Sequence, residues 1–312
     1  MWSYPALGLQ AVLWDRALDG HYGLPAAERA DPDPRPNLAA IAAHPELVAV
    51  GGGRGVFSAL PPGRHARPLD VLLTRYPAPG GVRVVASIAT PGSPADTLQA
   101  RFVILDQARH DVTREHALLG VSVCDPLGSR AVEFASDLAP GDYRAAFAVE
   151  DAHGGRGVVT RPLHVDPPPP GLAISDLVPV CGDLSTRLVD RTVRIEPRTG
   201  PVPPGGALDV YFEVAGLRAD SSGASRLRLT GRVRARPAVG HEAPRNAEIE
   251  TSREDTQPGA LRREFLHVPL AGLGPGAWNL EVEVRDLATG AIVSTSVDFE
   301  TGAPAAVTSA KP

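Results

Sequence analysis

Apolar and polar residues alternate with a period of two along much of the chain, and this alternation predicts β-strands. The clearest case is the segment WNLEVEVRD, in which Trp278, Leu280, Val282 and Val284 point one way and polar residues point the other. Comparable segments, separated by turns rich in Gly and Pro, begin at Leu69, Val82, Leu98, His116, Arg130, Tyr143, Gly157, Leu172, Thr192, Leu208, Ser225, Asn246, Arg262, Trp278 and Ala291. The pattern therefore predicts an all-β chain of short strands.

One of these segments occurs twice. Leu138–Asp151 (LAPGDYRAAFAVED) returns as Leu273–Asp286 (LGPGAWNLEVEVRD), an offset of 135 residues. Each copy is a Pro-Gly turn followed by a strand with a ring at its head, Tyr143 in the first and Trp278 in the second. A ring in this place resembles the tyrosine corner of immunoglobulin-like sandwiches. The repeat predicts two tandem immunoglobulin-like β-sandwich domains.

The domain boundaries follow from changes in composition. Residues 1–66 are expected to hold a hairpin around Asp19-Gly20, a short helix from Asn37 to Ala43 and a glycine-rich joint at Gly51–Gly55. The first sandwich is predicted at 67–165 and the second at 172–302. Between them, residues 166–171 contain four consecutive prolines, which favour a stiff polyproline II spacer. Residues 303–312 are predicted to be a disordered tail.

Composition narrows the possible partners. The net charge of −5 argues against a nucleic-acid-binding protein. No apolar run approaches the roughly 18 residues of a transmembrane helix. The start, Met1-Trp2-Ser3, has no signal-peptide pattern, which leaves two alternatives: a cytoplasmic chain, or a fragment of an exported protein whose signal lies upstream.

The two cysteines, Cys124 and Cys181, do not form a Cys-x-x-Cys pair. A bridge between them is one alternative. Their position in separate predicted domains, or at the domain junction, favours two buried free thiols.

Three stretches resemble the bacterial GWxTD-domain-containing proteins. They are Trp2–Leu24, the stretch LAPGDYRAAFAVED, and the pair Gly171–Leu177 and Leu208–Val214, which is similar to the family's "S-D" and "Y-f-E" strands. The Gly-Trp dipeptide of the naming motif is absent from the chain. The resemblance implies β-rich domains that follow a helical region, an exported or periplasmic location, and no defined reaction.

No enzymatic site is expected. The sequence has neither a G-x-S-x-G elbow nor an H-E-x-x-H motif, and Gly51–Gly55 has no Lys-Ser/Thr after it that would bind phosphate. His110 and His116 can share a strand face and hold a metal, but a solvated segment is the favoured interpretation. We therefore predict no catalytic residue, no cofactor and no metal site.

Two carboxylates and one row of cations are candidate sites. Asp151 and Asp286 end the repeated strands just before glycines, which indicates turn chemistry more than calcium binding. The possible interaction face is a row of arginines on one side of a single strand: Arg226, Arg228, Arg232, Arg234 and Arg236. Such a row can bind an acidic polymer or a phosphorylated partner. The favoured alternative is a cross-strand ladder with Glu281 and Glu283, or with Glu248 and Glu250.

These observations lead first to a non-catalytic structural or interaction module with a protein or envelope partner. A glycan- or ligand-binding module ranks second, and an accessory region of a larger hydrolase ranks third.

Overall fold

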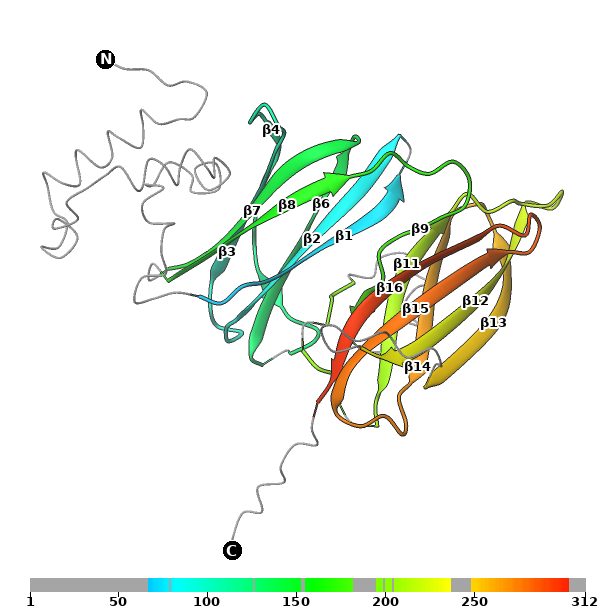
Figure 1. Ribbon diagram of the computed structural model, residues 1–312. Coiled ribbons are helices and arrows are strands. Elements are labelled where there is room, and N and C mark those ends of the chain that lie inside the picture. The colour runs from blue at the N-terminus through cyan, green and yellow to red at the C-terminus, as the bar shows by residue number, and fades with distance from the viewer. Residues whose placement is uncertain are drawn as a thin grey trace, which may run out of the picture. The chain divides into compact units, whose positions relative to one another are not determined.

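The computed structural model describes residues 67–78, 80–125, 127–152, 155–181, 195–198, 200–203, 205–236 and 248–302. These residues form β-strands and the loops between them, with no helix (Figure 1). The all-β prediction is confirmed. The expected N-terminal hairpin, the 37–43 helix, the Gly51–Gly55 joint and the tail lie outside the described residues.

The chain divides into two compact units. Unit 1 comprises Met1–Val71 and Ala86–Asp166, and unit 2 comprises Leu72–Val85 and Pro167–Pro312. The segment Leu72–Val85 thus groups with unit 2, whereas the sequence pattern assigned it to the first sandwich. The physical reason is an apolar cluster in which Tyr76 packs with Val178, Val180, Tyr211 and Phe265.

Two four-stranded sheets contain the strands predicted for the first sandwich, although Leu72–Val85, which covers parts of β1 and β2, groups with unit 2. One has the order β4-β3-β7-β8 and the other β1-β2-β6-β5. Their bounds are β1 (Asp70–Ala78), β2 (Gly81–Pro91), β3 (Leu98–Leu105), β4 (Asp111–Leu118), β5 (Gly120–Val121), β6 (Ser129–Leu138), β7 (Gly141–Asp151) and β8 (Arg156–Val165). Phe102 of β3 joins the layers, because its ring stacks on Phe134 of β6 at 5.6 Å and on Phe147 of β7 at 5.1 Å.

The second sandwich is built in the same way. Sheet β10-β11-β14, with β9 beside β11, faces sheet β13-β12-β15-β16. Their bounds are β9 (Ala173–Ile174), β10 (Val178–Val180), β11 (Ala207–Ala215), β12 (Ala224–Ala235), β13 (Ile249–Pro258), β14 (Arg262–Pro269), β15 (Gly276–Asp286) and β16 (Ile292–Thr301). One buried cluster fills the space between the sheets, with Phe212, Leu229, Leu266 and Val282 among its members.

The repeated segments form matching strand starts. β7 begins at Gly141 and β15 at Gly276, directly after the Pro-Gly turns. The Tyr143 hydroxyl donates a hydrogen bond to the carbonyl of Ala139 at 2.8 Å, which is a tyrosine corner. In the second copy, the Trp278 indole nitrogen donates to the Thr301 hydroxyl at 2.9 Å. The ring positions were predicted correctly, but each ring has its own hydrogen-bond partner.

The cysteine expectation is wrong. Both Cys124 and Cys181 are disulfide-bonded, and neither is a free thiol. The spacing along the chain was a poor guide, because residues far apart in sequence can lie close together in a folded chain.

We expect thiol labelling to confirm the bonded state. The native chain, unfolded without a reductant, should react with no equivalent of maleimide, and after reduction it should react with two, one for each cysteine. Intact mass before and after reduction gives the readout. Labelling of two thiols without reduction would contradict the bonded state.

No helix long and apolar enough to cross a bilayer occurs in the part of the chain that the structure describes.

Candidate functional site

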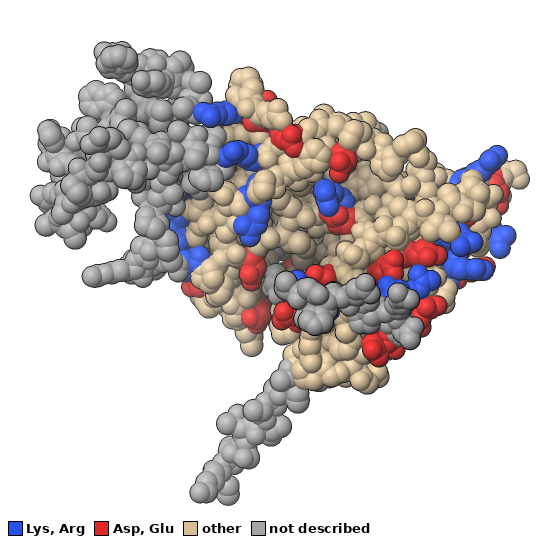
Figure 2. Space-filling view, in the orientation of Figure 1, with Lys and Arg blue, Asp and Glu red and all other residues tan. Residues whose placement is uncertain are grey.

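The predicted arginine row lies on the outer face of sheet β13-β12-β15-β16. Along β12 the side chains alternate, with Leu227, Leu229 and Val233 fully buried and Arg226 and Arg228 exposed. The predicted sidedness of this strand is therefore correct. Figure 2 shows cationic and anionic side chains close together over this region.

Most of the row is neutralised by acids on neighbouring strands. The ion pairs are Arg228–Glu254 at 2.5 Å, Arg232–Glu250 at 3.2 Å, Arg232–Glu283 at 3.3 Å, Arg234–Glu281 at 2.6 Å and Arg236–Asp298 at 3.5 Å. This is the cross-strand ladder, and it uses three of the four glutamates proposed for it. Such exposed pairs each contribute about 0–1 kcal/mol, so the ladder sets strand register more than overall stability.

One end of the row differs from the rest. Arg226 lies opposite Thr256 on β13. Arg228 lies directly opposite Arg285 of β15. Within the described residues, neither Arg226 nor Arg285 has a carboxylate oxygen within 4.0 Å, although Arg226 interacts electrostatically with Asp220. We call Arg226, Arg228 and Arg285 the cationic corner. Arg285 was not among the predicted site residues, because its sequence gives no sign of which strand it pairs with.

A second polar cluster contains the residues that carry the family resemblance. Ser175 Oγ accepts a hydrogen bond from the backbone of Glu213 at 2.9 Å, and the Ser175 backbone donates to the Glu213 carbonyl at 2.9 Å. The Tyr211 hydroxyl donates to Glu213 Oε1 at 2.8 Å. Asp176 forms an ion pair with Arg75 at 2.9 Å. These bonds fasten the short strand β9 and the Leu72–Val85 segment to β11.

Burial raises the pKa of the Tyr211 hydroxyl far above its usual range, and the negative charge of Glu213 raises it further. The hydroxyl is therefore held as a hydrogen-bond donor at neutral pH. In this structure the phenol donates its hydrogen bond to Glu213 on the same strand.

Sequence reasoning missed a buried charged cluster in the second sandwich. Arg262 and Glu264 of β14 are 2% and 1% exposed, and Arg262 Nη2 lies 2.6 Å from Glu264 Oε1. Arg262 also pairs with Asp255 at 2.7 Å, and Arg253 pairs with Glu264 Oε2 at 2.9 Å. Glu264 Oε1 has this close cation but no hydrogen bond of good geometry. The segment RREFLHVPL did not reveal these buried charges. Arg262 and Glu264 occupy the same face of the strand as Leu266 and Val268, and charged residues at the start of a strand are usually expected to be exposed.

Asp151 serves the turn that was predicted for it. Its Oδ1 accepts the Gly155 N–H at 2.8 Å, and its Oδ2 lies 2.8 Å from Arg67 Nη2. A Cβ on residue 155 would lie 2.3 Å from Asp151 Oδ2, so any larger residue there would have to displace the Asp151 carboxylate. All of these contacts are structural.

Asp286, its counterpart in the second copy, supports two loops at once. It accepts hydrogen bonds from the Arg218 N–H at 3.1 Å, the Ala288 N–H at 2.8 Å and the Thr289 hydroxyl at 2.9 Å. Burial raises the pKa of this carboxyl, but the bonds from Ala288, Arg218 and Thr289 together outweigh it and hold the pKa below the usual value.

Replacing Asp286 by alanine is expected to lower the free energy of unfolding of the second sandwich by about 2–3 kcal/mol, because buried donors lose their acceptor. Since the folded-state pKa is depressed, this stabilisation is present above the unfolded pKa of about 4 and is lost as pH falls through the folded pKa. Urea unfolding at pH 7 and pH 3 measures both effects. Asp298→Ala is the control, because its carboxylate is half exposed and its one ion pair is with Arg236. An equal loss in both variants would contradict the role of Asp286.

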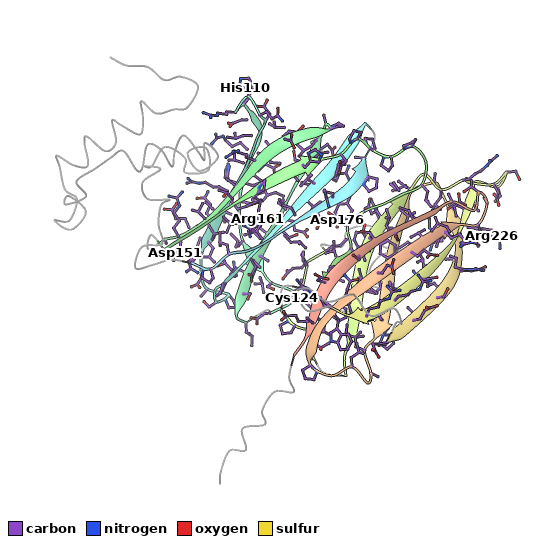
Figure 3. All side chains as sticks on the ribbon, viewed as in Figure 1. His110, Cys124, Asp151, Arg161, Asp176 and Arg226 are labelled. Carbon is purple, nitrogen blue, oxygen red and sulfur yellow. The ribbon has the colours of Figure 1, made fainter. Side chains whose placement is uncertain are left out.

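The histidines do not come together. His110 precedes β4 and lies 3.5 Å from Asp106, while His116 lies opposite Arg101 on β3. Figure 3 labels His110 at the end of the β3–β4 hairpin. Among the described residues, no group of three or more His, Cys, Asp or Glu side chains is placed to hold a metal ion.

No protein-family model and no curated protein matches the chain. Solved structures with β-rich domains do. A tetra-tandem repeat from the extending region of a large adhesion protein is 16% identical, with a TM-score of 0.23, over 76% of this chain and 50% of that one. Native E. coli alpha-2-macroglobulin is 16% identical, with a TM-score of 0.22, over 76% of this chain and 16% of that one.

The elastase-activated form of E. coli alpha-2-macroglobulin is 11% identical, with a TM-score of 0.26, over 78% of this chain and 22% of that one. The chain spans half or less of the length of these structures. At these TM-scores the similarity says nothing about ligand or activity, which depend on the residues of a site rather than on the type of fold.

Proposed function

We propose that the chain is a non-catalytic tandem β-sandwich module that holds or presents a protein or envelope surface. One observation carries this proposal: apart from Arg226, the polar side chains that the sequence offers as sites are occupied in structural contacts. Arg232 and Arg234 belong to the ladder, and Asp151 and Asp286 hold turns. Side chains committed to framework bonds favour a structural role over chemistry on a substrate.

We further propose that the module belongs to an exported bacterial protein of the GWxTD-containing type. Ser175, Tyr211 and Glu213, which carry part of that resemblance, bond to one another in the framework. On this proposal, the residues shared with the family stabilise the second sandwich. The disulfide-bonded state of both cysteines supports an oxidising compartment.

The test has a catalytic arm and a binding arm, both with the purified full chain. We expect no turnover of chromogenic esters, phosphate esters, glycosides or peptides. Turnover that co-purifies with the chain through successive columns, and that a single substitution abolishes, would overturn the proposal.

In the second arm, the tagged chain is cross-linked to a bacterial envelope fraction. We expect saturable capture of a defined protein that excess untagged chain competes away. Capture that does not compete contradicts the proposal, and hits on a glycan array in its place would favour the glycan-binding alternative.

A further inference from the structure

We propose that the cationic corner, Arg226, Arg228 and Arg285, binds an extended acidic segment of a partner protein. This inference gives the interaction module a specific surface and rests on the proposed function. The rest of the outer face of sheet β13-β12-β15-β16 serves to hold the sheet together.

The charge balance of the face separates the corner from the ladder. From Arg232 to Arg236, every arginine has a carboxylate partner within 3.5 Å. At the corner, three guanidinium groups share two acids among the described residues: Glu254 pairs with Arg228, and Asp220 interacts electrostatically with Arg226. Figure 2 shows cationic side chains gathered at the right-hand end of the view, where Figure 3 labels Arg226.

The strand register places two of these positive charges side by side, which is electrostatically unfavourable in the absence of a bound anion. Arg228 and Arg285 lie directly opposite each other on β12 and β15, and like charges in that position repel. The neighbour of Arg285 on β16 is Ile292 rather than an acid, so that strand does not offset its charge at this position. An anion placed between the two strands would relieve the repulsion. Guanidinium groups suit a carboxylate because they can donate two parallel hydrogen bonds to it.

The spacing of the corner fits an extended peptide. Arg226 and Arg228 are two residues apart on one strand, which separates them by about 7 Å. Acidic side chains at alternate positions of an extended segment have the same spacing. Ile292, which is 51% exposed, lies opposite Arg285 on β16 and adds an apolar margin to the corner. None of the residues named at the corner is aromatic, so it offers no platform on which nucleic-acid bases could stack.

The first experiment compares two double variants of the full chain with equal charge changes. Fluorescent poly-L-glutamate is the probe, and anisotropy at low salt gives the affinity. We expect Arg226→Ala with Arg285→Ala to weaken binding about tenfold or more, since each substitution removes one guanidinium group that would pair with the probe. Arg83→Ala with Arg161→Ala, on exposed positions elsewhere, should change it less than about twofold. Equal losses in the two double variants would overturn the proposal, because binding would then follow net charge alone.

The second experiment uses a matched pair on the same face. Glu254→Gln removes the acid that competes for Arg228, and we expect it to tighten binding about threefold. Glu250→Gln removes the same charge from the ladder beside Arg232 and should leave the affinity nearly unchanged. Tightening by Glu250→Gln as large as that by Glu254→Gln would contradict the proposal.

Inorganic polyphosphate is the competing probe. We expect it to bind more weakly than poly-L-glutamate at equal anion concentration. Tighter binding of polyphosphate would replace the acidic peptide with a phosphorylated ligand and overturn the assignment. These results are separate from the test of the proposed function, because a corner that binds no probe leaves the catalytic and capture arms unaffected.

Discussion

Replacing Arg262 by methionine is expected to lower the free energy of unfolding of the second sandwich by about 3–5 kcal/mol, because it removes the buried cation from the Glu264 carboxylate and leaves only Arg253 beside it among the described residues. Arg262 is 2% exposed, and its guanidinium lies between Glu264 and Asp255. Urea unfolding, with hydrogen exchange of the β12 and β15 amides as the readout, measures the change in the free energy of unfolding of this unit. Arg263→Met is the neighbouring control: its side chain is half exposed and pairs with Glu213 at 3.4 Å, so a loss below about 1 kcal/mol is expected.

A double replacement separates charge from packing. Arg262→Met with Glu264→Leu removes both buried partners and should recover most of the loss, since apolar residues of similar volume can replace a buried pair at little cost. A double variant less stable than the single variant would contradict this expectation. The attraction between the two buried charges would then stabilise the fold by more than their desolvation costs.

The pH dependence of the single variant has a definite sign. Burial raises the pKa of Glu264, while the cations of Arg262 and Arg253 lower it, and the net shift is upward. A raised carboxyl pKa contributes stability below the unfolded pKa of about 4.3, and this contribution is lost as pH rises through the folded pKa. Without Arg262 the pKa rises further. The deficit of Arg262→Met should therefore be larger at pH 7 than at pH 4.

Replacing Phe102 by alanine is expected to destabilise the first sandwich by about 3–5 kcal/mol. Its ring is fully buried and contacts both Phe134 and Phe147, so its loss opens a cavity between the two sheets. Because each unit has its own core, hydrogen exchange should accelerate in β3 and β7 and remain unchanged in β12 and β15.

Leu118→Ala is the control for Phe102. This side chain is in the same sheet but 66% exposed, so a change within about 0.5 kcal/mol is expected. Acceleration of exchange throughout both units in Phe102→Ala would show that the two cores do not unfold separately.

Strands with strong apolar alternation were predictable, and strands without it were not. β3 and β7 occupy the expected residues because their sequences alternate or are apolar throughout. β4 begins at Asp111, well before the predicted His116, and β13 continues to Pro258 through SREDTQP. Both of these segments are polar on each side. Only their hydrogen bonding to β3 and β12 makes them strands, and pairing across the sheet leaves no periodic signal in the segment itself.

The candidate site was predictable to the same extent. The period of two correctly placed the arginines of β12 on one face, because the direction of each side chain depends only on its position along that strand. Which acid meets which arginine depends on register with β13 and β15, and a shift of one residue would change every pair. For this reason the ladder could be proposed in outline, while Arg285 and the cationic corner could not.

The buried charges of β14 and β13 also affect how the protein meets copies of itself. In the described part of the chain, these two strands are the outermost of their sheets. A strand at a sheet edge has unpaired backbone groups that can recruit a strand from another molecule and start aggregation. Arg253 and Asp255 point inward from β13 toward Arg262 and Glu264, so a chain that docked there would have to bury more charge without partners. We therefore expect the cluster to disfavour fibre-like association through these two edges.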